Sequence, residues 1–391
     1  MTEIGTNWRV VDGLVTAWFD APSLTAGAEL ARSVAAVSAD TTFDLRATGV
    51  RVRLESAEHT DAVSAAARRL GLVANPAVLQ QLDVLIETDD PSGVSRFWQA
   101  VLDYPSGAQG ELTDPLRRDL AVRIRPSAEP RPLRNRIHLD VVRPAQAVEQ
   151  ADLGAPWGPF GVCHADPDGN EVDLVPGGPL DDSAETDDWQ AVFSAMACYR
   201  VSSSALQHEL AAAAAAVADD AGFPLLIDLR PGLVIIDSGK DQWENDAHGL
   251  ELDFTEVAAT VQRAARELGA SADPRLPRFV QLFLDAADVD AVRAFWIAAL
   301  GYTPDRRTGA NDIHDPRRLN PVLVFQELDA GETERRRQRN RIQIELAVPS
   351  DLAEERLATA LGAGGRLLDR SDDRRRIADP EGNELVLITT G

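Results

Sequence analysis

The chain has 391 residues, of which 44% are hydrophobic and 26% are charged, an ordinary globular mixture long enough for two to four domains. Its formal net charge of −24 repels phosphate backbones and anionic lipid headgroups, so we expect neither nucleic acid nor a membrane surface as a partner. No basic segment followed by an apolar run opens the sequence, and no apolar stretch of about 18 residues occurs, so the expected location is the cytoplasm.

The first segment, residues 6 to about 77, is predicted to be an α+β unit. Two short strands surround the turn Asp12-Gly13, a helix follows over residues 26–38, strands alternate over 43–54, and a second helix covers 60–70. The same order recurs over about 188–274, where Asp228-Leu229-Arg230 repeats Asp44-Leu45-Arg46. This segment is therefore present twice.

The second segment, residues 80–175, also recurs, as residues 278–389. The three repeated motifs are Phe97-Trp98 with Phe295-Trp296, Asn135-Arg136-Ile137-His138 with Asn340-Arg341-Ile342-Gln343, and Asp166-Pro167-Asp168-Gly169-Asn170 with Asp379-Pro380-Glu381-Gly382-Asn383. Each copy reads strand, helix and several strands, and then the same order again, so we expect two βαβββ modules per copy. Residues 176–187 are acidic and rich in turn residues, as in an exposed linker.

With these motifs in this order, both copies of the second segment resemble the glyoxalase-like domains of the vicinal-oxygen-chelate superfamily. Its members include glyoxalases, extradiol dioxygenases and bleomycin-resistance proteins. The resemblance implies that paired βαβββ modules form a half-open cup, and that the metalloenzymes take their ligands from the first and last strands of each module.

In the first copy these positions fall on Asp83, about Arg123, His138 and Asp173. Carboxylate and imidazole suit Fe, Mn, Ni or Zn, whereas arginine is not a ligand. The resemblance thus implies one divalent metal ion on Asp83, His138 and Asp173, with His138 and Asp173 as the catalytic residues. A histidine that only hydrogen-bonds within its sheet is the alternative for His138.

In the second copy the same positions fall on Gln281, about Gln326, Gln343 and Val386, none of which is a charged or imidazole ligand. We therefore expect any metal chemistry in the first copy alone. The three glutamines remain candidates for contacts to a polar ligand.

Other candidates for ligand contacts are arginines and loop aromatics. Arg123, Arg136 and Arg341 offer charged donors. Trp157 and Phe160 lie in a predicted Gly/Pro-rich loop and are candidates for an apolar ligand wall. Trp98 and Trp296, on predicted helices, are interpreted as core anchors.

Both copies of the first segment resemble pterin-4a-carbinolamine dehydratases, through Trp8-x-Val with Asp12-Gly13 and through Phe43-Asp44-Leu45-Arg46. That family's site uses a His-His-Pro motif and a further histidine. Gly222-Phe223 precede Pro224 in the second copy, and the position falls at about Ala39-Asp40 in the first, so both copies lack the paired histidines. We expect no dehydratase activity, because one displaced imidazole cannot replace a set that must donate and accept protons.

The predicted fold class is α+β, a duplicated two-domain unit. Its expected parts are dehydratase-like domains at 1–78 and 188–275, glyoxalase-like domains at 79–177 and 276–391, and a linker at 178–187. Because equivalent copies expose equivalent faces, we expect them to pair about an approximate two-fold axis inside one chain, as an intramolecular pseudo-dimer.

Several functions fit these residues. The first is binding of a small polar organic molecule, with glyoxalase-like lyase or isomerase chemistry in the first glyoxalase-like cup. The second is sequestration of a small molecule or antibiotic without catalysis, as in the bleomycin-resistance branch. The third is an assembly role for the paired dehydratase-like copies, and dehydratase activity is disfavoured by the missing histidines.

Overall fold

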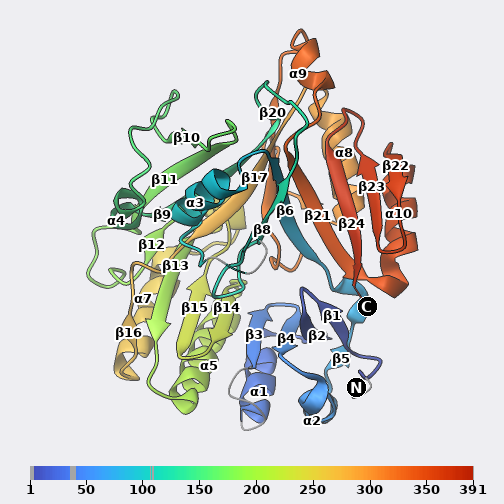
Figure 1. Ribbon diagram of the computed structural model, residues 1–391. Helices are drawn as coiled ribbons and strands as arrows, with labels where there is room; N and C mark the ends of the chain where they lie inside the picture. Colours follow the sequence, from blue (N-terminus) through green and yellow to red (C-terminus); the bar gives the residue numbers. More distant parts are fainter. Residues whose placement is uncertain (1–3, 36–40, 106, 108–109, 391) are drawn as a thin grey trace. The chain divides into compact units, whose positions relative to one another are not determined.

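The computed structural model describes residues 4–35, 41–105, 107 and 110–390 (Figure 1). The chain divides into two compact units, and each unit takes a segment from both halves of the sequence. The first unit comprises the residues up to Leu79 together with Gly177–Pro277, and the second comprises Gln80–Pro176 together with Arg278–Thr390. Within the described ranges, no helix has the length and apolar character needed to cross a bilayer.

The first unit is α+β in both of its segments. Its first segment contains β1 (Arg9–Val11), β2 (Leu14–Asp20), α1 (Leu24–Val34), β3 (Thr42–Arg46), β4 (Gly49–Leu54), η1 (Ala57–His59), α2 (Thr60–Arg69), β5 (Val73–Ala74) and η2 (Pro76–Val78). Its second segment contains β12 (Gln190–Ala191), β13 (Ala195–Arg200), α5 (Ser204–Ala221), β14 (Leu226–Arg230), β15 (Leu233–Asp237), α6 (Asn245–His248), α7 (Phe254–Glu267) and β16 (Ser271–Ala272).

The turn and helix signals of the first segment act as expected. Asp12 and Gly13 join β1 to β2 with φ of 49° and 74°, the two positive values that a type I′ hairpin turn requires. The helix expected over 26–38 appears as α1, whose N-cap hydroxyl on Ser23 accepts a hydrogen bond from the Ala26 N–H. The end of that expected helix and the Ala39-Asp40 position lie outside the described residues.

The two copies in the first unit share one antiparallel sheet, in the order β1-β2-β4-β3-β14-β15-β13-β12. At its centre β3 pairs with β14, and Asp44 lies opposite its own counterpart Asp228. Arg46 donates to Asp228 at 2.7 Å and Arg230 donates to Asp44 at 2.5 Å. The repeated Asp-Leu-Arg sequence is therefore the reciprocal contact between the copies, which pair as the duplication predicts.

The second unit contains the two copies of the longer segment. From the first copy come β6 (Gln81–Thr88), α3 (Pro91–Leu102), β7 (Glu111–Leu112), β8 (Val122–Pro126), β9 (Ile137–Pro144), α4 (Ala145–Gln150), β10 (Cys163–Ala165) and β11 (Glu171–Pro179). From the second come β17 (Phe279–Ala286), α8 (Val289–Leu300), β18 (Thr303–Pro304), β19 (Ile313–His314), β20 (Val322–Glu327), α9 (Thr333–Arg337), β21 (Ile342–Pro349), η4 (Ser350–Leu352), α10 (Ala353–Gly362), β22 (Arg366–Arg370), β23 (Arg374–Ala378) and β24 (Glu384–Thr390).

These strands form two sheets, and each sheet combines one module from each copy. One sheet, here called the arginine sheet, has the order β22-β23-β24-β21-β6-β8-β7. The other, called the histidine sheet, has the order β18-β19-β20-β17-β9-β11-β10. The joints between copies are the antiparallel pairs β6–β21 and β9–β17. The first half of one copy therefore lies beside the second half of the other.

The repeated Phe-Trp and Asp-Pro-x-Gly-Asn motifs meet in the core. Trp98 on α3 is fully buried, and its indole N–H donates to Asp166 at 3.0 Å. Trp296 on α8 makes the same 3.0 Å bond to Asp379. Each aspartate also accepts hydrogen bonds from the asparagine four residues later, which closes the turn. Both tryptophans are the core anchors that their helical spacing predicts.

Candidate functional site

A metal-capable cluster lies on the histidine sheet. His138 and Asp140 stand two residues apart on β9 and so project from the same face, and Asp173 projects from β11. One ligand atom from each of the three lies within 4.8 Å of the others. His138 Nε2 is 3.7 Å from an oxygen of Asp140. Imidazole and two carboxylates form a donor set that suits a divalent transition metal.

The second copy holds this cluster in place through β17. The His138 ring stacks on Phe283, directly opposite in the strand pair, with centroids 4.9 Å apart and planes 15° from parallel. Gln281 lies opposite Asp140 and donates to its carboxylate at 3.0 Å. Both contacts fix the orientation of a candidate ligand before any cation arrives.

The environment favours the neutral form of His138. Burial lowers the pKa of the ring, against the opposing effect of Asp285 and Asp173, whose negative charges raise it. A neutral imidazole keeps a nitrogen lone pair, the form in which histidine binds metals. Among the nearby groups, burial raises the pKa of the Cys163 thiol to about 12, so this cysteine is protonated at neutral pH and is a poor ligand.

Gln326 lies on the same face of the histidine sheet, but its amide is already engaged. Its side-chain N–H donates to Asp285 at 2.5 Å, and Asp285 also pairs with Arg335. The register places Gln326 opposite Asp285, whereas Arg123 in the other sheet lies opposite Leu85. Glu87 and Asp285 hold the same position in the two copies. Arg125, which lies opposite Glu87, is therefore the counterpart of Gln326.

Asp83 does not join His138 and Asp173, which corrects the expected three-ligand set. It lies on β6 of the arginine sheet, where its carboxylate accepts from Arg123 at 2.8 Å and from the Ala121 N–H at 2.9 Å. The physical reason is the exchange of modules: β6 pairs with β21 of the second copy, so the first and second modules of one copy line different sheets.

The arginine sheet has no free carboxylate pair at the corresponding place. Glu345, the counterpart of Asp140, accepts from Arg123 at 3.2 Å and from Arg374 at 2.5 Å. Gln343 and Val386 occupy the positions that match His138 and Asp173. Ion pairs therefore replace the metal-capable set, and Gln343 is left as a neutral amide among them.

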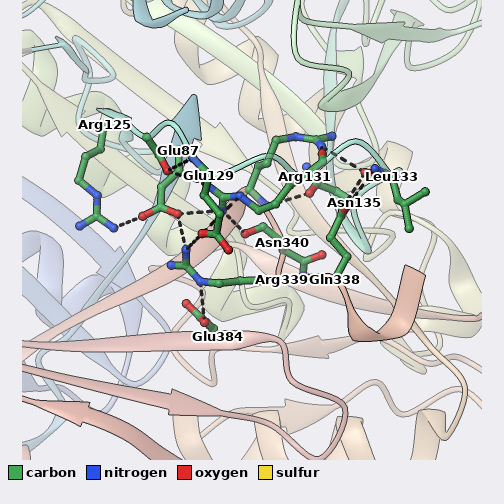
Figure 2. Close-up of polar contacts among 12 residues, drawn as sticks. Glu87, Arg125, Glu129, Arg131, Leu133, Asn135, Gln338, Arg339, Asn340 and Glu384 are labelled. Carbon is green, nitrogen blue, oxygen red and sulfur yellow. Dashed lines mark hydrogen bonds and ion pairs between the residues drawn. The ribbon is translucent and has the colours of Figure 1, made fainter. Parts of the chain in front are cut away.

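Glu87 is the centre of a further ion-pair network on this sheet (Figure 2). Its carboxylate pairs with Arg125, with Arg131 at 2.8 Å and with Arg339 at 2.6 Å. Arg339 also donates to Glu384 at 2.8 Å. These contacts tie β6 and β8 of the first copy to the chain before β21 in the second.

Arg136 and Arg341 are internal ties between the copies, which corrects their expected role as ligand donors. Arg136 is 1% exposed and donates to the Glu381 and Gln338 carbonyls, and Arg341 is 5% exposed and donates to the Gly169 carbonyl among others. The neighbouring asparagines are reciprocal as well, because Asn340 accepts from the Arg136 N–H and Asn135 accepts from the Arg341 N–H.

The loop aromatics remain accessible. Trp157 is 50% exposed and Phe160 is 85% exposed. Trp157 exchanges two backbone hydrogen bonds with Cys163, and Cys163 lies opposite Asp173 on β11. Because directly opposed residues of antiparallel strands project from one face, Trp157 borders the cluster on the side of Asp173.

The sequence interpretation identified His138 and Asp173 but missed Asp140. The signal was present, because in His138-Leu139-Asp140 a buried leucine separates two polar residues on an alternating strand. The contribution of Gln281 to this cluster had no local signal, since it depends on which copy supplies the neighbouring strand.

Comparison with protein families identifies the longer repeat. Residues 83–175 and 281–388, together just over half of the chain, each match the family described as "Glyoxalase-like domain". The chain belongs to this family. Its glyoxalase-like segments are those that form the second unit. Comparison with curated proteins found no match.

Solved structures that resemble the chain carry related names. Glyoxalase I from Zea mays has a TM-score of 0.39 and 9% identity, over 80% of this chain and 92% of that chain. A glyoxalase-related enzyme from Fulvimarina pelagi has a TM-score of 0.23 and 19% identity, over 28% of this chain and 84% of that chain.

Proposed function

We propose that this glyoxalase-like protein binds a small polar organic molecule at the histidine sheet, through one divalent metal ion held by His138, Asp140 and Asp173. The observation that carries the proposal is the convergence of these three side chains within 4.8 Å. When bound, such an ion acts as a Lewis acid that polarises a carbonyl or hydroxyl oxygen of the ligand. That chemistry is suited to a lyase or isomerase.

The chain's own residues have separate tasks in this proposal. His138 supplies a neutral nitrogen, and its stack on Phe283 keeps the ring from rotating. Gln281 donates a hydrogen bond to Asp140 and holds its carboxylate in place. The carboxylates of Asp140 and Asp173 balance the charge of a divalent cation. Three protein ligands leave positions open for a bidentate ligand, and Trp157 at the border supplies an apolar surface for the rest of it.

Sequestration without metal is the second candidate, and the half-exposed Trp157 beside the cluster favours it. In that case an aromatic or apolar molecule would bind against Trp157, and the polar cluster would only orient it. The two candidates differ in whether a cation is needed for binding.

Calorimetric titration of the chelator-treated protein with Mn²⁺, Ni²⁺, Zn²⁺ and Fe²⁺ tests the metal. We expect one metal site per chain. Its affinity should fall at least about tenfold in His138→Ala, because one of three protein ligands is lost. Gln343→Ala is the matched control, since Gln343 holds the corresponding position in the arginine sheet, and it should bind like the unmodified protein.

Gln281→Ala separates the composite site from a site made by one copy. It removes the amide that holds Asp140 and should lower the metal affinity severalfold, although Gln281 comes from the second copy. Equal affinity in the unmodified protein and His138→Ala would reject the metal site. Mass spectrometry of a ligand carried through purification, with and without chelator, then decides between the two candidates.

A further inference from the structure

A cavity of about 330 Å³ is lined by residues of the first unit. Its walls come from both copies of that unit: Thr41 and Phe43 lie at β3, Ser203 and His208 at the start of α5, and Gly232 in the turn between β14 and β15. The volume is at the lower end of the range of small-molecule sites, so it suits a compact ligand.

Two buried polar atoms in this wall have no hydrogen-bond partner among the described residues. They are the Thr41 hydroxyl oxygen and Nδ1 of His208, on residues that are 8% and 6% exposed. The His208 ring meets Phe43 edge-on at 6.2 Å, which fixes its plane. A buried polar group without a partner is destabilising, so both atoms point to a ligand that would satisfy them.

The cavity also receives the amino-terminal end of a long helix. α5 has 18 residues, its N-cap is Ser203, and its first turn contains no acidic residue. The N–H groups of a first turn carry a partial positive charge and bind anions. A negatively charged ligand is therefore favoured over a neutral one.

The equivalent helix of the first copy shows what this position accepts. At the start of α1, the carboxylate of Asp219 accepts from the Leu24 N–H at 3.1 Å, the Thr25 N–H at 2.8 Å and the Thr25 hydroxyl at 2.5 Å. Burial alone would raise the pKa of Asp219, but these hydrogen bonds lower it below its usual value. The molecule thus already holds one carboxylate at a first turn of this kind.

The first turn of α5 borders the cavity directly, because Ser203, Ser204 and Gln207 line it. Asp219 reaches the first turn of α1 from the last turn of α5. In the ranges that the structure covers, no carboxylate is bonded to the first turn of α5. The cavity lies where such a carboxylate would be.

We propose that this cavity is a binding site for a small molecule with a carboxylate or phosphate group, held by the first turn of α5, the Thr41 hydroxyl and the His208 ring. Burial lowers the pKa of His208, and the positive charge of Arg32 lowers it further, so the ring is neutral without a ligand. A bound anion favours the protonated ring, which then donates to it.

Calorimetry of the full chain with inorganic phosphate and with succinate tests the site. We expect one ion per chain, and a loss of affinity of at least about tenfold in Thr41→Val and in His208→Phe, because each removes a partner of a buried charge. Thr42→Val and His59→Phe are the matched controls, as neither residue lines the cavity. His138→Ala should also leave this binding unchanged, which separates the site from the proposed metal site.

The chain has six histidines, so imidazole NMR signals give a second measurement. Phosphate or succinate should shift the His208 signal, raise its titration midpoint and leave the other five unchanged. Absence of binding by the unmodified protein, or equal losses in Thr42→Val and Thr41→Val, would overturn the proposal.

Discussion

At the scale of single residues, Arg123 explains why the two sheets differ. Its guanidinium lies between Asp83 at 2.8 Å and Glu345 at 3.2 Å, and it also pairs with Glu111 at 3.1 Å. Burial opposes its charge, but these carboxylates raise its pKa above the usual value. In the histidine sheet the corresponding residue is Val324, opposite Phe283. The Arg123 guanidinium thus supplies a positive charge to the arginine sheet at the place where a metal ion is proposed to bind in the histidine sheet.

Replacing this arginine by its counterpart should expose two buried carboxylates. In Arg123→Val, Asp83 and Glu345 lose a shared partner, although Glu345 keeps Arg374. We expect the free energy of unfolding to fall by about 3 kcal/mol, the lower end for breaking a buried pair, because Arg123 is itself 31% exposed. Added Mn²⁺ or Zn²⁺ should restore part of it by binding the two carboxylates.

Urea denaturation with and without metal measures both effects. Arg125→Val is the control, because Glu87 keeps Arg131 and Arg339 when Arg125 is removed. A loss of stability in Arg123→Val that no divalent cation relieves would show that the two carboxylates do not form a cation site.

At the scale of elements, the sequence predicts the strands and helices of each copy but not which copies share a sheet. The alternation around His138, the Asp12-Gly13 turn and the Phe-Trp helices are local signals, and each appears where it was expected. The choice between β9 and β21 as the neighbour of β6 is different. The same Asn-Arg-Ile pattern leads into both strands, so their edges offer nearly the same pairing, and local sequence does not distinguish them.

Because local sequence does not determine this strand pairing, the residues of the predicted site lie in two different sheets. Asp83 and His138 belong to one copy in sequence, but the exchange of modules assigns them to different sheets and gives His138 the second-copy neighbours Phe283 and Gln281. Ligand positions could therefore be predicted one by one, whereas their grouping required the long-range strand pairs.

The Glu87 network should make the joint between the copies sensitive to acid. Burial opposes ionisation of Glu87, but hydrogen bonds from Arg125 and Arg339 lower its pKa to about 2. A carboxylate with a lowered pKa stabilises the fold fully above its usual pKa, and this stabilisation is lost as the pH falls towards 2. The full shift would correspond to about 3 kcal/mol, which solvent screening at the half-exposed Arg125 reduces to about 2 kcal/mol.

Glu87→Gln should therefore lower stability at pH 7 by about 2 kcal/mol and flatten the decline in stability below about pH 4.5. Denaturation midpoints measured between pH 7 and 3 provide the comparison. Glu129→Gln, at a carboxylate that is 53% exposed and pairs with Arg339, should change little. Parallel pH curves for the unmodified protein and Glu87→Gln would count against this role.

At the scale of the whole molecule, duplication inside one chain replaces the contact that two separate copies would otherwise make. Each compact unit contains both copies of its segment, and its central strand pair joins the two halves of the chain: β3 with β14 in one unit, β6 with β21 and β9 with β17 in the other. The linker between the halves closes a short hairpin of β11 with β12, and its residues 182–185 are exposed. The covalent link is thus one connection among several.

Cutting that link should leave the protein assembled. A protease site inserted between Asp182 and Ser183 should give two bands on a denaturing gel but a single species of the original size in gel filtration, because three inter-strand pairs and the reciprocal Asp-Arg and Asn-Arg contacts remain. The cut protein should also keep the proposed metal affinity, since β9 and β17 are still paired, and lose it once urea separates the fragments. Fragments that separate without denaturant would show that the halves depend on their covalent connection, and the uncut insertion variant controls for the inserted sequence.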